Sequence, residues 1–195
     1  MFLRRVATLV ACTMILPITP SPAQHAAGRG GGPAMAPAQA RQFDFLIGEW
    51  ELEVRPRVSS LAARLHGAPK LSGTWTASRA FDGWGIQDEL RIVDAGGNLQ
   101  AMTHSLRVFD ATALRWSQMG LDVLRARYSP SSGEWRDGEM VVTAQATDQD
   151  GKPHLVRVRF HSITASTFRY EQARSYDGGR KWDDPQLTIS AKRKA

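Results

Sequence analysis

FDFLIGEW, at residues 43–50, is the stretch that decides the fold, because a run of glycine, alanine and proline ends there and an alternating pattern begins. From Trp50 onward, Leu52 and Val54 alternate with glutamates. A period of two is typical of a β-strand that buries one face. We therefore expect the domain to open with this strand, preceded by a short helical turn at residues 43–47 that plugs one end of a barrel.

Further apolar runs with the same period follow, and helical periodicity is scarce. They lie at residues 71–80, 86–93, 99–109, 114–119, 124–128, 139–147, 154–161, 167–174 and 186–191. Residues that favour tight turns separate them at 94–98, 129–133, 148–151 and 177–179. An irregular stretch at 58–66 fits a short helix or a long loop. The pattern predicts an all-β fold, an antiparallel up-and-down β-barrel of about ten strands, with a β-sandwich as the alternative.

The opening stretch also resembles the FDFLIGxW signature of lipocalin-like bacterial domains of unknown function, which occur in exported proteins. Gly48 and Trp50 match the Gly-x-Trp that opens lipocalin-type barrels, and residues 81–88 resemble the family's early hairpin. The resemblance implies a lipocalin-like or calycin-like barrel in which the Trp50 indole packs across the closed end. It implies no agreed activity.

The first 23 residues have the features of an export signal. Arg4 and Arg5 precede an apolar run, and small residues end at Ala23. We expect a signal peptide at 1–23, a flexible Gly/Ala/Pro linker at 24–40 and the barrel at 41–195, in a periplasmic or secreted protein. An alternative is a lipoprotein anchored at Cys12.

Charge and hydropathy restrict the partners. Removal of Arg4 and Arg5 with the signal lowers the formal net charge from +6 to +4, and the remaining positive charge is dispersed except for a basic C-terminus. Nucleic-acid binders cluster such charge on one face, so we expect no nucleic-acid partner. No stretch reaches the ~20 apolar residues of a membrane-spanning helix, so we expect no integral membrane segment. The oligomeric state is left open.

The parity of each strand nominates the polar residues that face the interior. If Leu71, Ile86, Met102 and Leu114 point inward, then polar residues an even number of positions away do so as well. A barrel of this size holds packed side chains or one small ligand. The resulting candidate ligand-binding residues are Trp75, Arg79, Asp88, His104, Trp116, Gln118, Phe168, Tyr170 and Arg174.

Three interpretations of these residues stay open. The first is a small apolar or amphipathic ligand bound without chemistry. The second is a packed structural or protein-interaction module, in which Asp88 pairs with Arg79 or Arg174. The third is an enzyme that uses Asp88 and His104, for which the sequence offers little support. We expect no catalytic residues and favour the first interpretation.

Motifs for other chemistries are weak. The sequence has no HxH or HExxH spacing, no Gly-x-Ser-x-Gly elbow and no cysteine beyond Cys12. We expect no metal site and no cofactor; haem is disfavoured because only His104 is placed well inside. Ser175 to Trp182 resembles an Asp-box hairpin of sialidase propellers, and we interpret it as a fold-stabilising turn capped by Asp177.

Overall fold

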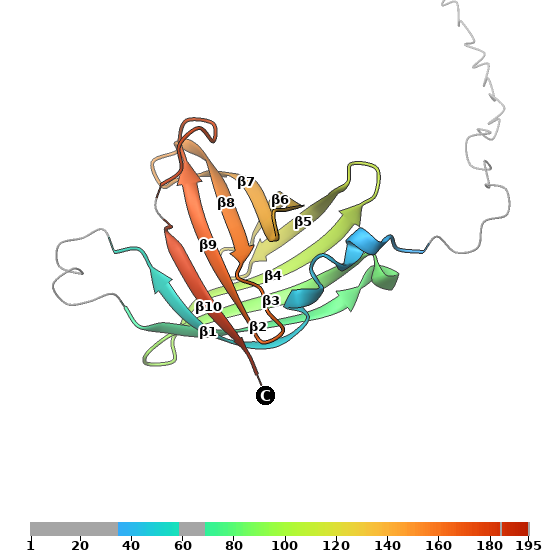
Figure 1. Ribbon diagram of the computed structural model, residues 1–195. Coiled ribbons are helices and arrows are strands. Elements are labelled where there is room, and N and C mark those ends of the chain that lie inside the picture. The colour runs from blue at the N-terminus through green and yellow to red at the C-terminus, as the bar shows by residue number, and fades with distance from the viewer. Residues whose placement is uncertain (1–34, 59–68, 184, 195) are drawn as a thin grey trace, which may run out of the picture. The chain divides into compact units, whose positions relative to one another are not determined.

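The computed structural model describes residues 35–58, 69–183 and 185–194, and this part of the chain forms a closed antiparallel barrel (Figure 1). Each strand pairs with the next one along the chain, and β1 closes the barrel on β10. The prediction of an all-β, up-and-down barrel of ten strands is confirmed, in place of a sandwich. The predicted signal peptide and Cys12 lie outside the described residues, as does most of the irregular stretch at 58–66.

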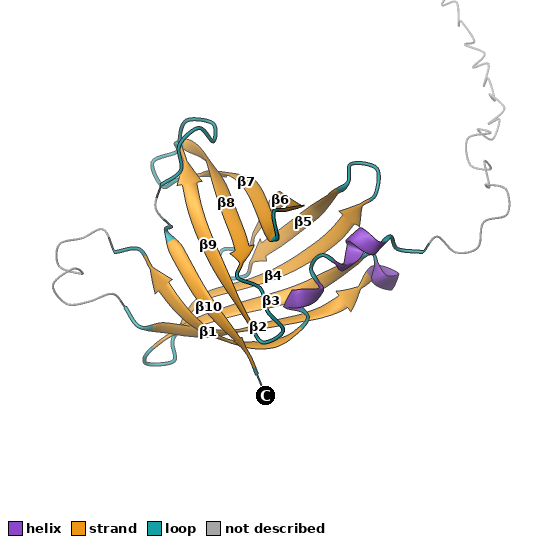
Figure 2. Ribbon diagram, in the orientation of Figure 1, coloured by secondary structure: helices purple, strands orange, loops and turns teal. Residues whose placement is uncertain are grey.

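The strands have the following bounds: β1 Gly48–Pro56, β2 Leu71–Ala80, β3 Gly85–Asp94, β4 Leu99–Asp110, β5 Arg115–Asp122, β6 Arg127–Arg136, β7 Glu139–Thr147, β8 Pro153–His161, β9 Thr167–Ser175 and β10 Leu187–Arg193. Within the described residues, three short 3-10 helices accompany them: η2 Ala38–Arg41, η3 Asp44–Leu46 and η4 Phe81–Gly83. Figure 2 shows these helices gathered at one end of the barrel.

β1 has the predicted parity. Trp50, Leu52 and Val54 are buried and the glutamates between them are exposed. Trp50 and Val54 lie opposite inward-facing residues of both neighbouring strands, which are β2 and β10. Charged residues on the outer face keep that face in water, so the alternation alone is enough to orient the strand.

The N-terminal helices plug the barrel at the end where β1 begins. Phe43 and Leu46 are fully buried, and the Trp50 indole donates a hydrogen bond to the Leu46 carbonyl at 2.8 Å. η2 begins inside the segment predicted as linker, and Ala40 is buried with the core. Small residues at this position allow the helix to lie close to the barrel, which the composition of the linker did not reveal.

Arg193 fastens the plug to the last strand. Its Nη1 donates to the Ile47 carbonyl at 2.8 Å and its Nε donates to the Ala165 carbonyl at 2.8 Å. The guanidinium also lies 4.2 Å from the centroid of the Trp50 ring. One residue therefore ties the plug, β10 and the β8–β9 connection together.

The predicted turn at 129–133 is wrong, and the predicted strand at 124–128 is right only for residues 127 and 128. The turn occupies residues 123–126, and Pro130 lies inside β6, opposite Met119 of β5. Ladder pairing with β5 outweighs the local turn preference of a Ser-Pro-Ser-Ser-Gly sequence. A true hairpin turn at Asp137 and Gly138, both with positive φ, was not predicted although Asp-Gly favours it.

Candidate functional site

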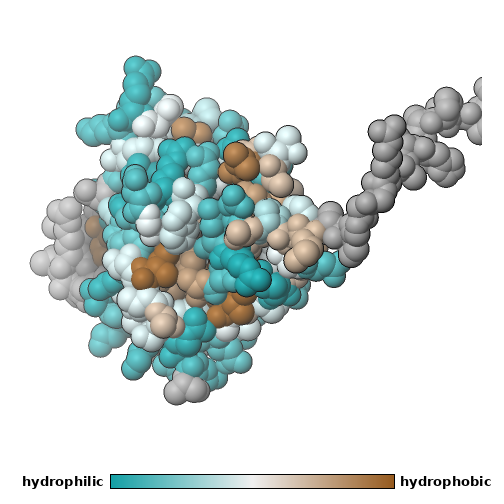
Figure 3. Space-filling model, turned by 45° about the vertical axis from the view of Figure 1, so that its right-hand side comes forward, coloured by the Kyte–Doolittle hydropathy of each residue, from teal (hydrophilic) through white to brown (hydrophobic). Residues whose placement is uncertain are grey.

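The outer face shown in Figure 3 is mostly hydrophilic, with small separate apolar patches, whereas the interior contains a group of buried polar side chains. Asp88 on β3, Arg107 on β4 and Gln118 on β5 are all at least nine-tenths buried. Register places Arg107 opposite Gln118, and neighbouring pairs bring Asp88 beside them. We call these three residues the interior cluster.

The interior cluster is held by charge-assisted hydrogen bonds. Arg107 Nε donates to Asp88 Oδ2 at 2.5 Å, Nη2 donates to Oδ1 at 3.1 Å, and Nη1 donates to Gln118 Oε1 at 2.5 Å. The Trp75 indole adds a fourth bond, to Asp88 Oδ1 at 2.9 Å. A buried ion pair is tolerated when such bonds replace the lost water. The predicted ion pair of Asp88 therefore exists, but its partner is Arg107 and neither Arg79 nor Arg174.

Aromatic rings enclose the charged pair. The Arg107 guanidinium lies 4.9 Å from the Phe43 centroid and 5.9 Å from the Phe160 centroid, within the range of cation–π attraction. Gln118 Nε2 is buried without a partner among the described residues and lies against Gly133. A Cβ at Gly133 would approach this nitrogen to 2.6 Å, so a larger residue there would require the Gln118 side chain to move.

A cavity of about 220 Å³ lies beside the interior cluster. Its walls are apolar and aromatic, with small hydroxyl-bearing residues between them. The lining residues are Trp75, Asp88, Leu90, Thr103, Ser105, Arg107, Gln118, Gly120, Ser129, Ser131, Val142, Ala144, Val158, Phe160 and Tyr170. Because Asp88 offsets the charge of Arg107, the walls carry no net charge.

Tyr170 contributes a polar tip to this wall. Its hydroxyl donates to Gln172 Oε1 at 3.0 Å, and its ring contacts Trp75 and Phe160 with centroids 5.8 Å and 5.3 Å away. Burial raises the pKa of Tyr170 to about 12, although nearby Arg107 opposes the rise. The phenol therefore stays neutral at ordinary pH and offers the cavity an uncharged surface.

The structure brings four of the nine predicted site residues to the cavity: Trp75, Asp88, Gln118 and Tyr170. Trp116 and Phe168 also point inward, but they lie in the packed plug end. The Trp116 ring meets Phe43 edge-to-face at 4.8 Å, and Phe168 meets Trp50 at 4.7 Å. Their parity was correctly predicted, and only their depth along the strand separates them from the cavity.

The two remaining predicted arginines lie elsewhere. Arg79 ends β2 beside the plug and forms an ion pair with Asp44, and both side chains are about one-third exposed. Arg174 is partly buried opposite Val156 near the other end of the barrel and is not among the described residues that line the cavity. Both arginines lie away from the cavity because of their position along the strand, which parity does not specify.

The inward placement of His104 is wrong. On β4 the buried residues are Ser105, Arg107 and Phe109, while Leu106 is 40% exposed, so His104 has the outward parity. Met102, Leu106 and Val108 have the outward parity of this strand, because Ser105 and Arg107 occupy inward positions beside the polar interior cluster. The predicted parity therefore left Arg107 outside, although the large apolar side chain of Phe109 indicates the true parity. Asp88 and His104 thus lie on opposite faces of the wall, so the structure does not bring the proposed catalytic pair together.

Other chemical groups are sparse in the part of the chain that is described. Among the described residues, His154 is a buried histidine, and its ring centroid lies 5.2 Å from that of Tyr176 in a tilted arrangement. Across residues 35–58, 69–183 and 185–194, no three His, Cys, Asp or Glu side chains gather closely enough to hold a metal ion. The helices of the same ranges are all too short or too polar to cross a membrane.

Ser175–Trp182 forms the expected capped turn. Asp177 Oδ1 accepts hydrogen bonds from the Lys181 N–H at 2.9 Å and from the Ser175 hydroxyl at 2.8 Å, and Ser175 Oγ accepts one from the Gly179 N–H at 2.8 Å. The bond from Lys181 is the main reason that the pKa of Asp177 is lowered. The motif stabilises a turn and contributes no side chain to the cavity.

Comparison with known proteins finds no matching family model and no similar curated protein.

Proposed function

We propose that this protein is an exported, non-catalytic β-barrel that binds a small apolar or amphipathic molecule in its interior. The observation that carries the proposal is the cavity of about 220 Å³ lined by Trp75, Phe160 and Tyr170 beside the interior cluster. Apolar walls with a few fixed polar groups are the usual composition of small-molecule sites. The export signal at 1–23 and the lipocalin-like resemblance of residues 43–50 are parts of the same proposal.

The cavity also limits the ligand. Its volume is below the ~300 to 1,000 Å³ of typical small-molecule pockets, so the buried portion of the ligand is small. The Asp88–Arg107 pair is internally neutral, and a buried ionic group would find no counter-charge there. The buried portion is therefore uncharged, and the hydroxyls of Ser105, Ser129 and Ser131 suit a single polar substituent.

Gly120 provides a direct test. It lines the cavity, and a Cβ added there would have no neighbour closer than 3.8 Å, so Gly120→Leu fills the cavity without a backbone clash. Ser117→Leu is the matched control, because Ser117 is exposed on the opposite face of the same strand. Purified wild-type and variant proteins are screened by thermal shift and tryptophan fluorescence against linear alcohols and aromatic alcohols of increasing length.

We expect the wild type and Ser117→Leu to be stabilised by the same compounds, since a ligand that binds only the folded state raises its stability. Gly120→Leu should lose at least tenfold in affinity while remaining folded. Equal affinity in all three proteins would place binding outside the cavity. No response to any compound would favour the alternative of a structural module.

A further inference from the structure

The wall of the barrel is incomplete between β6 and β7. These strands pair from Arg136 and Glu139 only as far as Ser132 and Thr143, although β6 extends back to Arg127 and β7 extends on to Thr147. Each strand remains paired on its other side over this length. Residues 127–131 and 144–147 thus face one another without a ladder. We call this opening the lateral slot.

The composition of β6 explains the lateral slot. Pro130 has no N–H to donate, and prolines occur in sheets where a strand lacks a partner on one side. The inward residues Ser129 and Ser131 are small and polar, so little apolar burial draws the strands together. Unpaired backbone groups along the slot need water as a partner, which requires that solvent can reach them.

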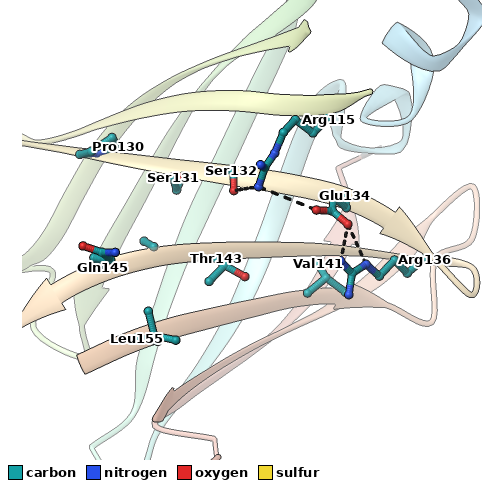
Figure 4. Close-up of a pocket in the computed structure, with 11 residues that line it drawn as sticks. Arg115, Pro130, Ser131, Ser132, Glu134, Arg136, Val141, Thr143, Gln145 and Leu155 are labelled. Atoms are coloured by element: carbon teal, nitrogen blue, oxygen red, sulfur yellow. Dashed lines mark hydrogen bonds and ion pairs between the residues drawn. The ribbon is translucent and has the colours of Figure 1, made fainter. Parts of the chain in front are cut away.

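A groove on the outside of the barrel lies over the lateral slot. It has a volume of about 490 Å³ and follows the outer faces of β6 and β7 (Figure 4). Ser131 and Ala144 line both this outer groove and the interior cavity. Figure 4 shows the two strands close together near Glu134 and Val141 and further apart toward Pro130 and Gln145. The groove and the cavity therefore share the small side chains of Ser131 and Ala144 as a common wall.

The outer groove is cationic at the end where β6 and β7 are paired. Arg136 is paired with Glu134, and Arg115 donates to the Ser132 hydroxyl at 2.8 Å while its guanidinium stays 3.8 Å from Glu134. Two guanidinium groups and one carboxylate leave a net charge of +1. Arg115 is 46% exposed and Arg136 is 64% exposed, so both have donors that a ligand in the groove can reach.

We propose that the lateral slot is the ligand's passage, and that the ligand is an amphipathic carboxylate whose apolar tail enters the cavity while its carboxylate stays in the outer groove near Arg115 and Arg136. This inference rests on the proposed function and adds the ligand class. The neutral cavity accepts the tail, and the guanidinium groups provide the charge-assisted hydrogen bonds that a carboxylate needs. Neither compartment alone satisfies both ends of such a molecule.

The test compares linear carboxylic acids with alcohols of equal chain length. The variants are the double substitution Arg115→Gln with Arg136→Gln, the single substitution Glu134→Gln, and Arg91→Gln as a control that removes a charge from the exposed face of β3. Exposed ion pairs contribute little to stability, so these proteins remain folded. Affinity is measured by calorimetry at low and moderate salt.

We expect the double variant to bind the acids at least tenfold more weakly and the alcohols unchanged. Glu134→Gln should bind the acids more tightly, because a competing carboxylate is removed, and Arg91→Gln should match the wild type. Loss of alcohol binding in Gly120→Leu would show that the alcohols bind in the cavity. If that is found but the double variant binds the acids as tightly as the wild type does, this inference is wrong and the proposed function stands. If neither acids nor alcohols bind, both fail.

Discussion

Arg107 and Asp88 form a two-point ion pair inside the barrel, with Nε to Oδ2 at 2.5 Å and Nη2 to Oδ1 at 3.1 Å. The pair sets the polarity of the cavity and supports one of its walls. It also replaces the water that both charges lose on folding, which makes each partner dependent on the other.

Asp88→Ala leaves Arg107 buried without its counter-charge. The expected loss is about 3 to 5 kcal/mol of unfolding free energy, the usual effect of breaking a buried pair from one side. Urea unfolding followed by far-UV circular dichroism measures it. Glu53→Ala is the control, because its pair with Arg55 is highly exposed and should change stability by less than about 0.5 kcal/mol. Equal stability of the two variants would mean that the interior cluster is hydrated.

Phe43→Ala removes a fully buried ring from the plug. Loss of its contacts with Trp116 and Phe160 should destabilise the protein by about 3 to 5 kcal/mol. Met35→Ala serves as the control, since Met35 is 89% exposed. Thermal and urea unfolding give the difference. A loss below 1 kcal/mol would show that the plug contributes little to the fold.

Tyr170 gives the protein a specific alkaline sensitivity. Its pKa is about 12 in the folded state because of burial, against about 10 in an unfolded chain. The folded state holds the phenol proton more tightly than the unfolded chain does. The contribution of Tyr170 to the free energy of unfolding is therefore fully present below pH 10 and is lost as the pH rises from 10 to about 12. The loss is about 2 to 3 kcal/mol at the upper limit.

Difference titration of the wild type against Tyr170→Phe isolates this group by its tyrosinate absorbance. We expect the wild type to show a titration step near pH 12 that Tyr170→Phe lacks. The variant should also lose less free energy of unfolding between pH 10 and 12. A missing step near pH 10 would contradict the burial of Tyr170 in the folded protein.

Asp177→Ala removes the acceptor that caps the turn after β9. Amide exchange at Lys181 should accelerate, because its N–H loses the 2.9 Å bond to Asp177. In the wild type the pKa of Asp177 is lowered, so the cap is present at neutral pH and is lost as the pH falls through that lowered value. Asp150→Ala, in another exposed turn, is the control. Unchanged exchange at Lys181 in Asp177→Ala would exclude the capping role.

Four of the nine site residues predicted from the sequence line the cavity. Strand parity placed Trp75, Asp88, Gln118 and Tyr170 inside because their strands alternate cleanly between apolar and polar faces. It failed for His104, because β4 places apolar residues outward and a charged one inward. Only contact with a partner on another strand makes that arrangement favourable.

The sequence by itself determined that this chain forms an antiparallel all-β domain beginning near Trp50, since a period of two and turn residues act locally along the chain, and the pairing of β1 with β10 in the tertiary structure decided that the sheet closes into a barrel. Tertiary structure alone decided that Arg107 is the partner of Asp88, that β6 runs through Pro130, and that β6 and β7 separate beyond Ser132. The physical reason is range: alternation is a property of neighbours in sequence, whereas ion pairing, register and strand separation depend on residues that only the closed barrel brings together.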